Sequence, residues 1–304
     1  MTASGNNVRI TEVGMRDGFQ MESRILPTNI KVAIGEALIG AGVRYIEVTS
    51  FVSRTAVPQL ADAAEVVGRL RGKGAELSAL VPNAGGARRA VAAGIDRVTI
   101  FASASETHNL KNVRRTVAES LNGLNEIGAI VRDANTALAG AVATSFGCPF
   151  EGEVSVDAVL RVIEGYVAVG ADLISLGDTT GMATPPVVER VVAAIRSRFP
   201  DLALTLHFHN TRGLGLVNVL KGLELGISNF DASIGGLGGC PFAAGATGNI
   251  STEDLVYMLH EIGLESGIDL PALISVALRV EAEFGRVLPG QVMKAGPRLR
   301  LHSA

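Results

Sequence analysis

Short apolar, β-branched segments recur along this chain and alternate with longer stretches of helical periodicity. The short segments lie at residues 8–13, 45–51, 77–81, 98–101, 139–144, 173–175, 204–208 and 230–234. In the first long stretch, Ile30, Ile34 and Leu38 follow the i, i+4, i+8 spacing that places apolar side chains on one face of a helix. Leu255, Leu259 and their neighbours repeat that pattern beyond the last short segment. The alternation predicts a strand followed by a helix, repeated about eight times.

Glycine occupies the expected end of several helical stretches, immediately before the next strand. It does so in the tripeptides 41–43, 93–95, 169–171 and 225–227. We therefore expect an α/β protein with a (β/α)₈ TIM-barrel fold, in one domain that spans residues 1–304. The barrel should occupy about residues 8–250, and residues 251–304 should form additional helices on or across the barrel mouth.

A doubly wound open sheet is the alternative fold, and the glycine motifs speak against it. Gly213-Leu-Gly215 lacks the third glycine of a dinucleotide-binding fingerprint. The segment 235–239 lacks the Lys-Ser/Thr pair of a P-loop.

Composition narrows the function classes further. The 304 residues are 47% hydrophobic and 19% charged, which is enough apolar material for a large core. A formal net charge of -3, without a Lys/Arg run, argues against a nucleic-acid partner. Because no segment resembles a signal peptide or a membrane span, we expect a soluble cytoplasmic protein with no membrane partner. Cys148 and Cys240 are expected to be free thiols in such a protein.

Polar residues directly after the first two strands are the first candidates for chemistry, because TIM-barrel active sites lie at the carboxyl ends of the strands. Arg16 and Asp17 stand side by side after the first strand, followed by a glycine. Glu47 in the second strand shares a face with Thr49. Glu47 could serve the site or could simply pair with Arg16.

The seventh strand ends in His207-Phe208-His209, and strand alternation places both imidazoles on the same face. Two histidines on one face form half of a metal site, and Asp17 could add a carboxylate. Such ligands suit a divalent ion, but they leave the identity of the ion open.

The glycine-rich segment 235–249 follows the eighth strand and contains Cys240. A segment of this composition with one thiol at the barrel mouth is typical of a lid with a functional residue. Cys148, which precedes Pro149, is a weaker candidate for contact with substrate.

These motifs together resemble the 3-hydroxy-3-methylglutaryl-CoA lyase family, from about residue 8 to beyond residue 260. The resemblance is carried by segments 12–20, 49–53, 57–59, 103–106, 147–149, 175–179, 207–209 and 235–241. The Arg-Asp-Gly and His-x-His elements are shared with isopropylmalate and homocitrate synthases. The Gly-Gly-Leu-Gly-Gly-Cys-Pro segment is more specific to the lyases.

The resemblance implies roles for individual residues. The implied ligands of a divalent cation, Mg²⁺ or Mn²⁺, are Asp17, His207, His209 and Asn249. The implied catalytic residues are Arg16, Asp17, Glu47, His207 and Cys240. Those implied to bind substrate are Gln20, Ser50, Ala141, Ser175 and Asp178. The implied partners are an acyl-CoA substrate and further copies of the chain in a dimer or tetramer, with no organic cofactor beyond the CoA of the substrate.

The implied reaction is a metal-dependent retro-Claisen cleavage of 3-hydroxy-3-methylglutaryl-CoA, or a related 3-hydroxyacyl-CoA, to acetyl-CoA and a 3-oxoacid. Arg16 would steady the enolate, Glu47 would orient the cluster, and Cys240 would act in proton transfer. The general base could be Asp17 or His207. A Claisen-condensing acyltransferase of the isopropylmalate or homocitrate synthase type is the alternative, disfavoured by the cysteine-bearing segment and by the absence of a long C-terminal domain. A non-catalytic binding protein would require a vestigial metal site.

Two departures from the family pattern concern the substrate. Arg212 adds a cation shortly after the His-x-His element. Ala141 stands where the family carries a tyrosine that contacts the acyl group. We therefore expect a wider acyl pocket, unless Phe146, Phe150 or Arg212 occupies the space.

Overall fold

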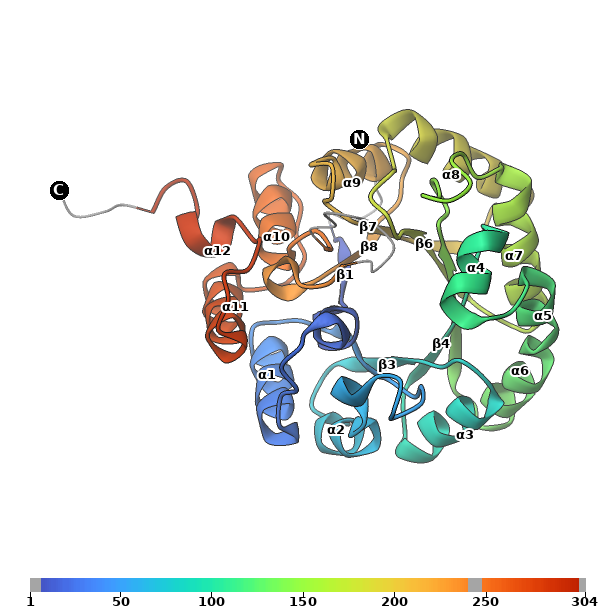
Figure 1. The fold of residues 1–304 in the computed structure, drawn as a ribbon. Coiled ribbons are helices and arrows are strands. Elements are labelled where there is room, and N and C mark those ends of the chain that lie inside the picture. Colours follow the sequence, from blue (N-terminus) through green and yellow to red (C-terminus); the bar gives the residue numbers. More distant parts are fainter. Residues whose placement is uncertain (1–6, 240–247, 301–304) are drawn as a thin grey trace.

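Eight parallel strands form a closed barrel in the order β1 to β8, as shown in a computed structural model that describes residues 7–239 and 248–300 (Figure 1). The strands are β1 (Arg9–Glu12), β2 (Tyr45–Ser50), β3 (Glu76–Leu80), β4 (Arg97–Ser103), β5 (Ala137–Ala143), β6 (Leu173–Asp178), β7 (Ala203–Phe208) and β8 (Asn229–Ala232). β8 pairs with β1, which closes the barrel. The TIM-barrel prediction is confirmed, and the open-sheet alternative is wrong.

The helices surround the barrel as an outer ring. They are α1 (Thr28–Gly40), α2 (Ala63–Leu70), α3 (Ala84–Ala93), α4 (Glu106–Val113), α5 (Val117–Asn122), α6 (Leu124–Asp133), α7 (Val156–Ala168), α8 (Pro185–Arg198), α9 (Gly215–Glu224), α10 (Thr252–Glu261), α11 (Leu270–Phe284) and α12 (Val292–Ala295). Short turns of helix add η1 (Gly14–Gly18), η2 (Phe19–Met21), η3 (Pro58–Leu60) and η4 (Ile234–Gly236). The glycines expected to end helices at positions 42, 94, 170 and 226 all have positive φ, a conformation that costs glycine little.

The apolar core lies between the strands and the ring of helices. Ile100, Leu206 and Phe230 are almost completely buried there. The side chains on the opposite, inner face of the strands are more polar, with Thr99 and Thr205 among them. TIM-barrel interiors are usually filled by bulky branched side chains. Here a cavity of about 970 Å³ reaches from the mouth into the barrel.

The C-terminal helices expected after residue 251 are present and lie on one flank of the barrel (Figure 1). α10 follows β8 in the outer ring, and α11 packs against α1. The segment after α11 reaches the barrel mouth, where Leu288 packs against Gly235 in η4. Among the described residues, no helix is long and apolar enough to cross a membrane.

Candidate active site

The turn after β1 carries the first two charged groups of the site. The amide groups of Arg16 and Asp17 both donate to the carbonyl of Val13, at 3.1 and 2.7 Å, and wind η1 directly after the strand. Gly14 begins this turn, and a β-carbon there would lie 2.6 Å from a carboxylate oxygen of Glu12. Glycine is therefore required for the close approach that turns Arg16 and Asp17 into the barrel mouth.

Arg16 lies between two carboxylates. Its Nε donates to Glu47 Oε2 at 2.5 Å, and its Nη1 donates to Asp17 Oδ1 at 2.6 Å. Burial raises the pKa of Glu47, although Arg16 opposes this effect. Burial would also raise the pKa of Asp17, but Arg16 and the two histidines outweigh it and the pKa is lowered. The Arg16–Glu47 pair, one of the two alternatives considered for Glu47, is therefore present, and Asp17 is held ionised beside it.

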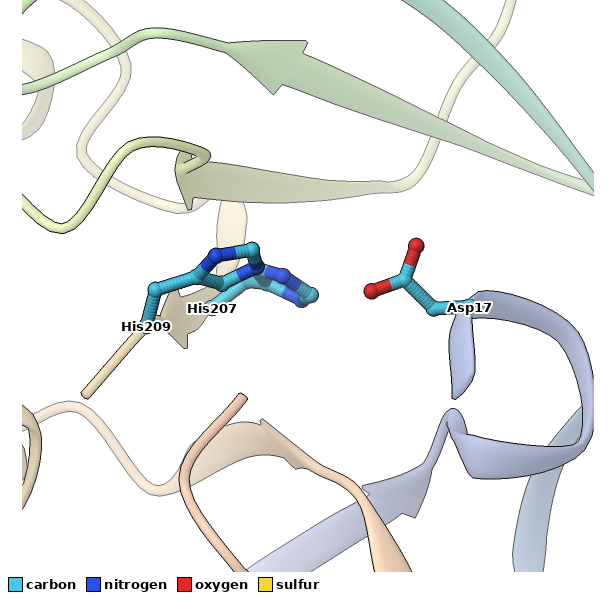
Figure 2. A group of neighbouring side chains, drawn as sticks. All are labelled: Asp17, His207 and His209. Carbon is cyan, nitrogen blue, oxygen red and sulfur yellow. The ribbon is translucent and has the colours of Figure 1, made fainter. Parts of the chain in front are cut away.

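The two histidines predicted to share a face do so at the end of β7. Ligand atoms of Asp17, His207 and His209 all lie within 4.8 Å of one another. Figure 2 shows the Asp17 carboxylate pointing toward both imidazoles across the barrel mouth. This cluster of one carboxylate and two imidazoles is a candidate metal centre.

Unpartnered buried atoms next to this cluster fit a bound cation. Asn249 donates through Nδ2 to Asp17 Oδ2 at 2.8 Å, and its Oδ1 is buried without a hydrogen-bond partner among the described residues. His209 Nδ1 is also buried without a hydrogen-bond partner among the described residues. Burial and the neighbouring His207 lower the pKa of His209 to about 3, so its imidazole is neutral, as a metal ligand must be. The four residues implied as ligands thus lie together, and two of them, Asn249 and His209, have a buried atom without a hydrogen-bond partner among the described residues.

Asp231 belongs to the site, although the sequence did not single it out. It stands opposite His207 in the register of β7 and β8. Its Oδ2 lies 3.3 Å from His207 Nδ1 and accepts a hydrogen bond from Ser175 Oγ at 2.9 Å. Burial would lower the pKa of His207, but Asp231 outweighs it and the pKa is raised. A lone acid within the apolar segment 230–234 was the signal that could have identified it.

Ala141 lines the cavity from β5, opposite Phe101 of β4 in the strand register. The side chains considered as substitutes for the missing tyrosine lie elsewhere. Phe146 packs on Phe208 outside the cavity. Phe150 is partly exposed near Lys111, and Arg212 donates to backbone carbonyls of the loop after β6.

The remaining predicted site residues differ in their access to the cavity. Gln20 and Ser175 line it, and Gln20 donates to Asp17 Oδ1 at 3.0 Å. Ser50 is buried at the end of β2 and is not among the lining residues. Asp178 is also buried away from the lining, and its Oδ1 accepts from the amides of Met182 and Ala183.

The structure describes only one of the two cysteines. Cys240 lies outside the described residues. Cys148 is a free, fully buried thiol, as expected, and its Sγ donates to Ser105 Oγ.

The fold and this cluster define a class of protein, a TIM-barrel enzyme with a candidate divalent-metal centre at its mouth. The chain belongs to the HMGL-like family, whose model matches residues 7–280. It is therefore a carbon–carbon lyase, and the family resemblance found in the sequence is confirmed.

Three relatives illustrate the similarity. The hydroxymethylglutaryl-CoA lyase of Bacillus subtilis is 43% identical over 285 residues, covering 93% of this chain and 95% of that protein. The (R)-citramalyl-CoA lyase of Chloroflexus aurantiacus is 42% identical over 301 residues, covering 95% of each chain. The structure of an HMG-CoA lyase from Acinetobacter baumannii with coenzyme A and 3-methylmalate superimposes with a TM-score of 0.94 at 47% identity, over 100% of both chains.

Proposed function

We propose that this enzyme cleaves 3-hydroxy-3-methylglutaryl-CoA, or a related 3-hydroxyacyl-CoA, to acetyl-CoA and a 3-oxoacid. The observation that carries the proposal is the cluster of Asp17, His207 and His209 beside the Arg16–Glu47 pair in the barrel mouth. The relatives that this chain matches over nearly their whole length are named as lyases of CoA thioesters of this kind, and neither is named as a condensing enzyme.

Asp17, His207, His209 and Asn249 would hold a divalent ion, Mg²⁺ or Mn²⁺. When bound, such an ion acts as a Lewis acid that lowers the pKa of the substrate hydroxyl. The neutral imidazole of His209 and the ionised carboxylate of Asp17 are in the protonation states that this role requires.

Arg16 would stabilise the enolate that leaves when the carbon–carbon bond breaks. Glu47 and Asp17 hold its guanidinium in place, and a fixed cation stabilises developing negative charge without reorganisation. N–H groups that do not point at these carboxylates remain available for the thioester oxygen.

Removal of the hydroxyl proton requires a base at the same place. His207 and Asp17 are both candidates, and Asp231 supports His207 because it favours the protonated imidazole that would form. Cys240 is proposed as the acid that protonates the enolate carbon, because thiols have a reference pKa near ~8.5.

Product analysis tests the proposal. The enzyme is incubated with Mn²⁺ and, separately, with 3-hydroxy-3-methylglutaryl-CoA, (R)-citramalyl-CoA and a longer 3-hydroxyacyl-CoA. The expected result is acetyl-CoA and an oxoacid in equal amounts from at least one thioester, for example acetoacetate from the methylglutaryl thioester or pyruvate from (R)-citramalyl-CoA, and none with His209→Ala. Condensation of acetyl-CoA with a 2-oxoacid, without cleavage of any thioester, would overturn it.

A further inference from the structure

Glu12 is a buried carboxylate that joins three segments of the barrel mouth. It ends β1 and has no exposed surface. Its Oε1 accepts from the amides of Gly14 and Ile234, at 2.7 and 2.8 Å. Its Oε2 accepts from the hydroxyl of Thr252 at 2.5 Å. One side chain therefore connects the turn that carries Arg16 and Asp17 with the turn after β8 and with the start of α10.

Glu253 makes a second connection between two of these segments, the turn after β8 and the start of α10. It lies in the first turn of α10 and is also fully buried. Its two carboxylate oxygens accept from the amide of Gly235, at 2.9 and 3.1 Å, and Oε2 also accepts from Ser251 Oγ. The segments joined here flank residue Asn249, whose amide contacts Asp17.

The two carboxylates have no cationic partner among the described residues, and each accepts hydrogen bonds only from backbone amides and hydroxyls. Burial raises the pKa of Glu12 to about 7 and that of Glu253 to about 8, and Glu12 adds to the second shift. Unpaired buried charge is costly, so the neutral acids are favoured near neutral pH. A neutral isostere should therefore preserve the connection: glutamine keeps one acceptor oxygen for the backbone amides, and its NH₂ group can donate to the hydroxyl of Thr252 or Ser251.

We propose that Glu12 and Glu253 are positioning residues that form a buried latch, which fixes Asp17 and Asn249 relative to each other across the barrel mouth. Neither touches the reacting atoms, and both act through the backbone of η1 and η4. This inference rests on the proposed metal site, because it concerns how two of the ligands are held.

Asp254 provides a matched control on the same helix. Its carboxylate also accepts from backbone amides, those of Gln291 and Val292, and burial also raises its pKa. Those amides belong to the segment that leads into α12 and not to η1 or η4, the two turns that Glu12 and Glu253 hold. Removal of this carboxylate tests the general cost of losing a buried anchor in α10.

Manganese titration and amide hydrogen exchange of the full chain test the latch. In Glu12→Ala and Glu253→Ala we expect Mn²⁺ to bind about tenfold more weakly, the size of effect typical of residues that support metal ligands. Exchange at Gly14, Ile234 and Gly235 should become faster in the metal-free protein. Glu12→Gln and Glu253→Gln should bind Mn²⁺ nearly as the wild type does. Asp254→Ala should lower the melting temperature and leave Mn²⁺ affinity unchanged.

Three outcomes of these measurements would contradict the proposal. If the folded Ala variants bind Mn²⁺ as tightly as the wild type, the two glutamates stabilise the fold but do not position the metal ligands. The same conclusion follows if Asp254→Ala loses as much Mn²⁺ affinity as they do. If the Ala variants do not fold, the Gln variants decide: a tenfold loss in either would contradict a latch that works as a neutral acid. A wild type that binds no Mn²⁺ would overturn the proposed metal site and the positioning role together, which distinguishes it from failure of the latch alone.

Discussion

Asp231 places its carboxylate against the imidazole of His207, from the strand next to the one that carries both histidines. Carboxylates in this position fix the orientation of a ligating histidine and increase its basicity. We predict that Asp231→Asn lowers Mn²⁺ affinity and kcat/KM by about tenfold or more. Metal titration and steady-state kinetics measure the two effects.

Asp172→Asn is the matched control for Asp231→Asn. It alters a carboxylate that pairs with Arg97, at the opposite end of the barrel. It should leave Mn²⁺ affinity unchanged. Equal behaviour of the two variants would show that Asp231 does not support the site.

Cys240 carries a prediction that comes from the sequence alone, because it lies outside the described residues. If its thiol protonates the enolate carbon, Cys240→Ser should lower kcat strongly and change KM little. Steady-state kinetics of this variant, with Cys148→Ser as the comparison, would separate the two parameters. Equal effects on kcat and KM would indicate a role in binding instead.

At the scale of single elements, local sequence patterns predicted much of the site. Each predicted strand is present, and alternation within β7 correctly placed His207 and His209 on one face. These inferences succeeded because strand periodicity and the position of chemistry at strand ends are local rules.

Contacts between distant segments were not predictable in the same way. Asp231 faces His207 only because of the register between β7 and β8, and Glu12 meets Ile234 and Thr252 across more than 200 positions of sequence. Neither register nor the meeting of loops at a barrel mouth follows from the pattern of one segment. The sequence identified Glu12 as part of a motif, but it did not predict the residues that hydrogen-bond to Glu12.

β5 carries the prediction about substrate size. Ala141 presents a methyl group to the cavity, and neither Phe146, Phe150 nor Arg212 lines the space. We expect kcat/KM to be higher for a longer 3-hydroxyacyl-CoA than for the methylglutaryl thioester, because imprecise positioning can cost about a hundredfold in rate.

The variant Ala141→Tyr should shift this preference back toward the methylglutaryl thioester. Ala139→Ser, on the same strand and also lining the cavity, adds little volume and serves as the control. A wild type that already prefers the methylglutaryl thioester with the efficiency of a dedicated lyase would contradict the wider pocket.

For the whole molecule, Glu12 and Glu253 predict how stability depends on pH. Their pKa values rise from 4.5 to about 7 and about 8 on folding, so the folded state binds more protons than the unfolded state between these limits. The stability that they contribute is fully present below about pH 4.5 and is lost as the pH rises through 7 to 8.

Thermal unfolding of the wild type and of both Gln variants between pH 5 and 8 measures this contribution. Each unit of pKa shift corresponds to about 1.4 kcal/mol, so the decline in stability with rising pH should be visibly smaller in each Gln variant. Parallel curves for all three proteins would show that these carboxyl groups do not titrate as described.

The metal dependence of bond cleavage tests the central claim most directly. The enzyme is exhaustively chelated, and acetyl-CoA formation from the best 3-hydroxyacyl-CoA is measured before and after Mn²⁺ is restored, in the wild type and in His209→Ala. His260→Ala, in α10 and away from the cavity, is the control. We predict that chelation abolishes cleavage, that Mn²⁺ restores it in the wild type and in His260→Ala, and that His209→Ala stays inactive. Full activity of the metal-free wild type would contradict the account.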